Sequence, residues 1–151
     1  MSRTKEAMAQ DIETSLHNLR TDYIDLYQIH NPSLAELEQV AAPGGALEAL
    51  LEAKAAGRIG HIGVTAHMAS VFEKALTMDW VETVMFPYNI VETQGEALIQ
   101  RCREQNVGFI CMKPMAGGAL EDARLALRFI RQNENVSVVI PGMYDCLLYT
   151  S

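Results

Sequence analysis

The sequence predicts an α/β fold of parallel β-α-β units, for three reasons. Runs rich in β-branched and aromatic residues alternate with helical patterns at intervals of roughly 25 to 40 residues. Polar or Gly/Pro-rich segments follow the runs, at the strand ends where a (β/α) barrel carries its active site. No Gly-x-Gly-x-x-Gly follows a strand, so the signature of a dinucleotide-binding doubly wound sheet is missing. The last two observations favour a (β/α) barrel over a small doubly wound sheet. A complete barrel needs about 250 residues, so the chain is expected to hold only part of one.

Each predicted helix has an apolar stripe at helical spacing or a recognisable cap. The first, at residues 5–19, carries Met8, Ile12 and Leu16 on one face. Ser33 is a typical N-cap for the second helix, and Gly57 closes the alanine-rich third. The later helices are expected at 34–40, 46–56, 70–78, 95–105 and 120–132.

The predicted strands are short apolar runs that end at turn-forming residues. They span 23–29, 61–65, 81–86, 107–112 and 136–140. Pro87, Pro114 and Pro141 stop the last three. His30 stands directly after the first strand, on the same face as Leu26 and Gln28. From position alone, His30 either caps the strand by bonding a backbone carbonyl or serves as an acid, base or hydrogen-bond donor.

Composition bounds the class of protein. The chain has 151 residues, 49% of them hydrophobic, and a net charge of −7, which argues against a nucleic-acid or anionic-membrane surface. No apolar run reaches the roughly 18 residues that span a bilayer, and no signal peptide opens the chain. Cys102, Cys111 and Cys146 are widely spaced, which fits neither a disulfide framework nor a metal pair. We therefore expect a single domain in a reducing cytoplasm.

Several motifs, in order, resemble the aldo/keto reductase family. Residues 15–30 (SLHNLRTDYIDLYQIH) resemble the signature that leads to the family's active-site histidine. Residues 57–65 (GRIGHIGVT), 86–89 (FPYN) and 112–118 (MKPMAGG) resemble the fifth-, sixth- and seventh-strand regions of its barrel. The likeness runs from about residue 15 to 143 and is strongest to bacterial members with Thr-x-His after strand five. Many of those carry a C-terminal iron–sulfur extension, whose cysteines would lie beyond Met143.

The resemblance implies an oxidoreductase that reduces aldehydes or ketones with NADPH. The family is a (β/α)8 barrel with a catalytic tetrad of Asp, Tyr, Lys and His, and His30 corresponds to the histidine. The other three lie on barrel strands two and three, which would precede Met1, and none of the five tyrosines present sits at the matching position. The chain is thus expected to hold strands four to eight with their helices and to be inactive alone.

The resemblance also suggests residues that bind the cofactor. Thr65 corresponds to a hydroxyl that contacts the nicotinamide carboxamide, although a Thr at a strand end can equally cap the next helix. Asn89 is either a pocket-loop residue or a plain turn residue. Met112 stands where many members stack an aromatic ring on the nicotinamide, and Met85 and Ala66 replace the usual Gln and Asn.

The segment after the fourth predicted strand suits a pyrophosphate. Lys113 brings a positive charge, Pro114 stops the strand, and Gly117 lets the backbone approach a ligand before a helix begins. A solvated surface lysine and a plain loop are the alternatives. No metal ligand set is expected, and NADH in place of NADPH, the substrate and the oligomeric state are open.

The domain organisation predicted is a barrel part at 1–145 and a non-native tail at 146–151. The tail, CLLYTS, breaks the likeness and resembles a translated sequencing adapter; a natural apolar tail is the alternative. Two other functions are compatible with the sequence. One is a non-catalytic, nucleotide-binding regulatory subunit of the same fold, favoured by Ala66, Met85 and Met112. The other is an unrelated phosphate-binding barrel enzyme.

Overall fold

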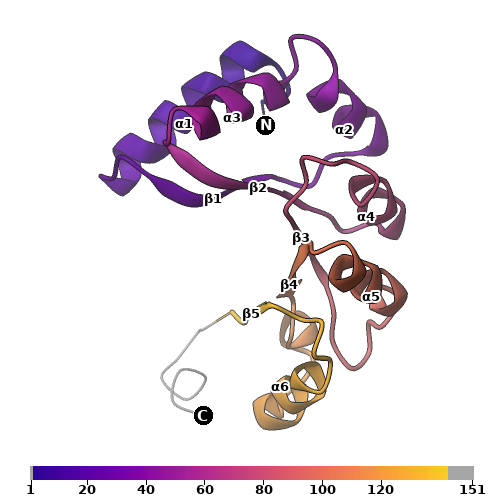
Figure 1. Cartoon of the computed structure of the whole chain (residues 1–151). Coiled ribbons are helices and arrows are strands. Elements are labelled where there is room, and N and C mark those ends of the chain that lie inside the picture. The colour runs from indigo at the N-terminus through magenta and orange to yellow at the C-terminus, as the bar shows by residue number, and fades with distance from the viewer. Residues whose placement is uncertain (1, 143–151) are drawn as a thin grey trace.

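The computed structural model describes residues 2–142, which form one sheet of five parallel strands with helices against it. The strands are β1 (Ile24–Ile29), β2 (Ile59–Thr65), β3 (Thr83–Pro87), β4 (Gly108–Met112) and β5 (Val138–Ile140). They lie side by side in the order of the chain. The sheet curls, and the helices cover its convex side (Figure 1). The predicted fold class, part of a (β/α)8 barrel, is confirmed.

The helices lie where the sequence pattern predicts them, but α4 ends at residue 75 instead of 78 and the last helix starts later than expected. They are α1 (Lys5–Leu19), α2 (Leu34–Ala41), α3 (Ala46–Ala55), α4 (Ala69–Ala75), α5 (Glu96–Glu104), the 3-10 turn η1 (Ala116–Gly118) and α6 (Ala123–Arg131). Residue 120 was the expected start of α6, but the helix begins at Ala123 because the Asp122 carboxylate accepts the Leu125 N–H and caps it. None of the helices in residues 2–142 is long and apolar enough to cross a bilayer.

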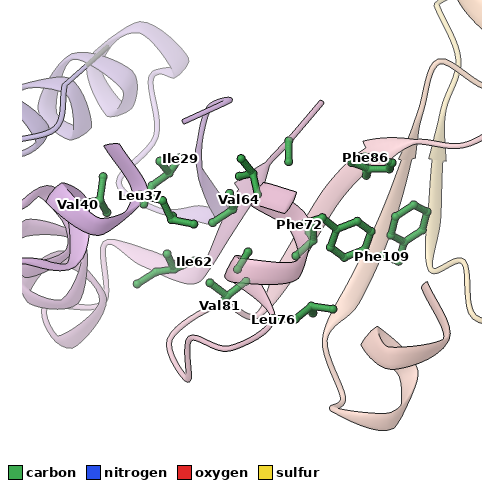
Figure 2. Packing of buried hydrophobic residues seen from close by; sticks show 14 of the residues in the cluster. Ile29, Leu37, Val40, Ile62, Val64, Phe72, Leu76, Val81, Phe86 and Phe109 are labelled. Carbon is green, nitrogen blue, oxygen red and sulfur yellow. The ribbon is translucent and has the colours of Figure 1, made fainter. Parts of the chain in front are cut away.

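The core lies between the sheet and the helices. Residues at alternate strand positions, among them Ile62, Val64 and Phe86, are fully buried against α2 and α4 (Figure 2). Phe72 of α4 packs on Phe86 and Phe109, with ring centroids 5.2 and 5.8 Å apart. Each buried side chain of this size contributes about 1.5 to 3 kcal/mol by leaving water. This layer therefore holds the strands in register.

The other face of the sheet is concave, and its residues form layers set by the strand register. Gln28 pairs with Gly63, Gly63 with Thr83, and Thr83 with Gly108, so these four form one layer. The next layer toward the strand ends runs from Thr65 through Met85 and Ile110 to Val138. Because all five strands are parallel, the loops that follow them lie at one edge.

The described residues do not reach the end of the chain. The predicted tail at 146–151, with Cys146, and the boundary at residue 145 lie outside them. Within residues 2–142, β1 and β5 each pair with a neighbour on one side only.

Candidate active site

His30 and Thr65 meet at the C-terminal edge of the sheet. β1 and β2 pair in register up to Ile29 and Val64, which brings the two following residues side by side. The Thr65 hydroxyl lies 3.1 Å from His30 Nδ1 and is 4% exposed, whereas His30 is exposed. The ring of His30 therefore bonds a side-chain hydroxyl. Thr65 does not cap the next helix, because the N-cap of α4 is Met68 and makes no side-chain cap bond.

The loop after His30 is held from two sides. Asn31 has a left-handed backbone (φ 41°), and its N–H donates to the Thr65 hydroxyl at 2.8 Å and the Thr65 carbonyl at 3.0 Å. From the other side Arg3 donates through Nη2 to the His30 carbonyl and through Nε to Glu36, both at 3.3 Å. These bonds limit how far the His30 backbone can move relative to β2.

Glu36 completes this clamp. It forms a reciprocal capping box with Ser33, accepting the Ser33 N–H at 2.7 Å. Hydrogen bonds from Ser33, and then from Arg3, lower the pKa of Glu36 to about 2. The carboxylate therefore stays ionised, and Arg3, whose side chain is 10% exposed, keeps an anionic partner at neutral pH. The clamp was not predicted from the sequence. The capping-box sequence Ser33-Leu-Ala-Glu36 was the one feature of the sequence that pointed to it.

Asn89 joins the loops after β3 and β4. It is fully buried, and its amide donates to the Lys113 carbonyl at 2.9 Å and to Glu92 at 2.6 Å. Its oxygen accepts the N–H groups of Val91 and Glu92, each at 3.0 Å. Asn89 is therefore fully engaged in holding the two loops together, which places it behind the site rather than at its surface.

The segment after β4 is a compact turn. Lys113, Ala116 and Gly117 have positive φ, Lys113 is exposed and Pro114 is buried. Most of the turn's N–H groups bond its own carbonyls, including Ala116 to Lys113 at 2.9 Å. The nearby end of α6 is capped by the Asp122 carboxylate. Lys113 is therefore the main attraction for an anion at this turn, and the helix end adds little.

The two methionines predicted to face the nicotinamide lie on the concave side. Met85 is the register partner of Thr65, and Met112 pairs with Pro87 and Ile140. Both are partly exposed. The structure thus brings His30 to Thr65 and Asn89 to Lys113, along one edge of the sheet. Among residues 2–142, no cluster of three His, Cys, Asp or Glu residues could hold a metal ion.

Chemically, this edge combines an imidazole held at one nitrogen, after β1, with a cationic turn three strands away, after β4. An imidazole N–H can donate to a polarised carbonyl oxygen and favour the developing negative charge. A curled parallel sheet with such groups at its C-terminal edge is typical of a (β/α)-barrel enzyme.

Comparison with known proteins identifies the family. Residues 2–124 match the sequence model of the aldo/keto reductase family. The chain belongs to this family, and the resemblance seen in the sequence is confirmed.

Individual relatives agree with this assignment. Aldo-keto reductase YhdN of Bacillus subtilis is 30% identical over 122 residues, 76% of this chain and 35% of YhdN. Methylglyoxal reductase DkgB of Escherichia coli is 28% identical over 144 residues, 91% of this chain and 51% of DkgB.

Solved structures support the fold. The holo form of aldo-keto reductase AKR11C1 from Bacillus halodurans superposes with a TM-score of 0.83 at 22% identity, over 96% of this chain and 59% of that one. An aldo-keto reductase from Klebsiella pneumoniae in complex with NADPH gives 0.73 at 22%, over 93% and 56%. The chain spans about a third to a half of the two curated relatives above.

Proposed function

We propose that this chain supplies the carbonyl-binding histidine and part of the cofactor site of an NADPH- or NADH-dependent reductase of aldehydes or ketones. The observation that carries the proposal is the His30–Thr65 pair at the C-terminal edge of a parallel sheet, with Nδ1 of His30 bonded and the ring exposed. This leaves Nε2 to donate to a substrate oxygen. Binding the oxygen this way orients the carbonyl and stabilises the charge that develops on it.

The residues present fit part of a nicotinamide dinucleotide. Thr65 can bind the carboxamide, the exposed Lys113 can bind a phosphate oxygen, and Met112 can pack on a ring through its sulfur. Pro114, Gly117 and Asn89 shape the turn that presents Lys113. When bound, the cofactor supplies the hydride.

We further propose that the 151-residue chain does not reduce carbonyls alone. The family's Tyr, Lys and Asp, which donate the proton and tune that donation, have no counterparts at matching positions here.

The two buried cysteines at 102 and 111 are free, which fits a cytoplasmic enzyme in a reducing compartment.

The test joins residues 2–142 to the part of B. subtilis YhdN that precedes its match to this chain. Oxidation of NADPH is followed with methylglyoxal, the substrate named for DkgB. We expect turnover by the chimera, a loss of at least about 100-fold in His30→Ala, and no turnover by the chain alone. His67→Ala, an exposed histidine after β2, is the matched control and should keep its activity. A chimera whose turnover is unaffected by His30→Ala, or reduction by the chain alone that His30→Ala abolishes, contradicts the proposal.

A second function, a regulatory subunit that binds nucleotide without turnover, is favoured by Ala66, Met85 and Met112, which replace the usual nicotinamide contacts. It predicts that the chimera quenches NADPH fluorescence on binding and yet reduces no carbonyl.

A further inference from the structure

We propose that Thr65 is a positioning residue that holds His30 in the tautomer with its proton on Nε2. The inference rests on the proposed function, because only then does the Nε2 proton meet a substrate. It gives Thr65 a role toward the histidine in addition to any contact with the cofactor.

The hydrogen-bonding capacity of the Thr65 hydroxyl decides the direction of the bond. A hydroxyl has one hydrogen to donate and two lone pairs to accept with. One lone pair accepts the Asn31 N–H at 2.8 Å. Among the residues that the structure describes, His30 Nδ1, at 3.1 Å, is the one acceptor within reach of the hydroxyl hydrogen.

Burial makes this direction the favourable one. Thr65 is 4% exposed, and a buried hydroxyl whose hydrogen finds no acceptor loses free energy. If Nδ1 carried the proton, the hydroxyl would accept two bonds and its own hydrogen would lack a partner in the described part of the chain. If Thr65 donates, both groups are satisfied.

Neighbouring carbonyls offer Nδ1 little alternative. A proton on Nδ1 commonly bonds a backbone carbonyl. Here no backbone carbonyl of residues 2–142 forms a hydrogen bond with His30 Nδ1, whose one partner there is the Thr65 hydroxyl. Nδ1 is therefore the acceptor, and the ring proton lies on Nε2, which has no hydrogen-bond partner in residues 2–142. The second lone pair of Thr65 remains for a donor such as a carboxamide.

The test reads the tautomer directly by NMR of the 151-residue chain labelled with 15N-histidine, in alkaline buffer where imidazoles are neutral. Long-range 1H–15N spectra separate a protonated from an unprotonated Nδ1, and a His30→Asn variant assigns the signals. His61 is an internal standard, because its Nδ1 lies 2.7 Å from the Glu82 carboxylate, which can only accept. We expect His61 protonated on Nδ1 and His30 protonated on Nε2.

Substitutions at Thr65 complete the experiment. Thr65→Val, which keeps the shape and removes the hydroxyl, should lower the Nε2–H to Nδ1–H ratio of His30 by up to about tenfold, as loss of one net hydrogen bond implies. Thr65→Ser should restore it, and His61 should not change. Wild-type His30 protonated on Nδ1, or a ratio that is equal in all three chains, overturns the inference. Because no turnover is measured, this result is independent of the chimera test of the reductase function.

Discussion

A histidine lies at each end of β2, and the two are bonded to different kinds of partner. His30, which follows β1, bonds Thr65 at the C-terminal end of β2, whereas His61 belongs to β2 and lies near its N-terminal end. At the C-terminal end His30 faces the neutral Thr65 hydroxyl (3.1 Å), and after β3 the uncharged Asn89 amide bonds the Lys113 carbonyl and the Glu92 carboxylate. At the N-terminal end His61 Nδ1 and Lys54 Nζ both contact the Glu82 carboxylate, at 2.7 and 2.6 Å. The Ile62 N–H also donates to Glu82 at 2.9 Å.

The difference separates precise positioning from charge-dependent stability. A hydrogen bond between neutral groups depends on geometry and is almost insensitive to salt, whereas partly exposed ion pairs are screened by salt. The His30–Thr65 bond should therefore depend on salt less than the ion pairs of Glu82 do. Substitutions at each end, and between them, test this contrast.

The largest effect is expected at the C-terminal edge. Asn89→Ala removes the buried amide that bonds the Lys113 carbonyl, the Val91 N–H and the Glu92 carboxylate, while the Glu92 N–H keeps its bond to the backbone carbonyl of residue 89. We expect the free energy of unfolding, measured with urea, to fall by about 3 kcal/mol, equally at low and high salt. The matched control is the partly exposed Asn133→Ala, whose amide donates one long bond of 3.4 Å to Tyr88 and accepts the Asn135 N–H at 3.1 Å, and which should cost about 1 kcal/mol. A strong salt dependence for Asn89→Ala would contradict the contrast.

A second prediction concerns Gly63, which lies between His61 and Thr65 on the concave face. A Cβ there would collide with the Thr83 hydroxyl and approach Gln28 Cγ to 3.2 Å. Gly63→Ala should therefore cost about 2 kcal/mol by overpacking. The Thr83 hydroxyl is buried without a hydrogen-bond partner in residues 2–142, so Thr83→Ala alone should cost little. The double variant should recover more than half of the loss; failure to do so would show that the strain lies elsewhere.

The smallest effect is expected at the N-terminal edge. Partial burial raises the pKa of Glu82, but hydrogen bonds from Lys54, His61 and the Ile62 N–H outweigh this and lower it from 4.5 to about 2. Since the folded-state pKa lies below the ordinary value, the ionised carboxylate stabilises the fold above about pH 4.5, and this contribution is lost as the pH falls toward 2. Glu82→Gln should cost about 1 to 2 kcal/mol at pH 7 after allowance for solvent screening.

The measurement is urea unfolding of Glu82→Gln and wild type at pH 7 and pH 3. The gap between the two should narrow at pH 3 and in high salt. Glu104→Gln, which removes an exposed carboxylate bonded to Gln100, is the control and should have almost no effect. A gap that is equal at both pH values would assign the loss to packing instead of charge.

The sequence predicted the architecture because strand and helix periodicities are local. The run of β-branched and aromatic residues that stops before Asn31-Pro32 placed His30 at a strand end, and the order of motifs indicated the family. The register that sets His30 beside Thr65 depends on pairing between segments 35 residues apart, which no local pattern reveals. Arg3 and Asn89 act through tertiary bonds for the same reason. The start of α6 could have been predicted from Asp122, a typical N-cap residue directly before the helix, but the helix was expected to begin at the apolar Leu120.

Strands that follow one another in space as they do in sequence make the sheet resemble a repeat protein. Each unit is stabilised mainly by its nearest neighbours, so cooperativity is carried through successive interfaces. β5, with three residues, ends this series, whereas β2, with seven, lies within it. Of the two edge strands in residues 2–142, β5 is shorter than β1, which has six residues. Opening that begins at β5 therefore reaches the Lys113 turn before it reaches the His30–Thr65 pair.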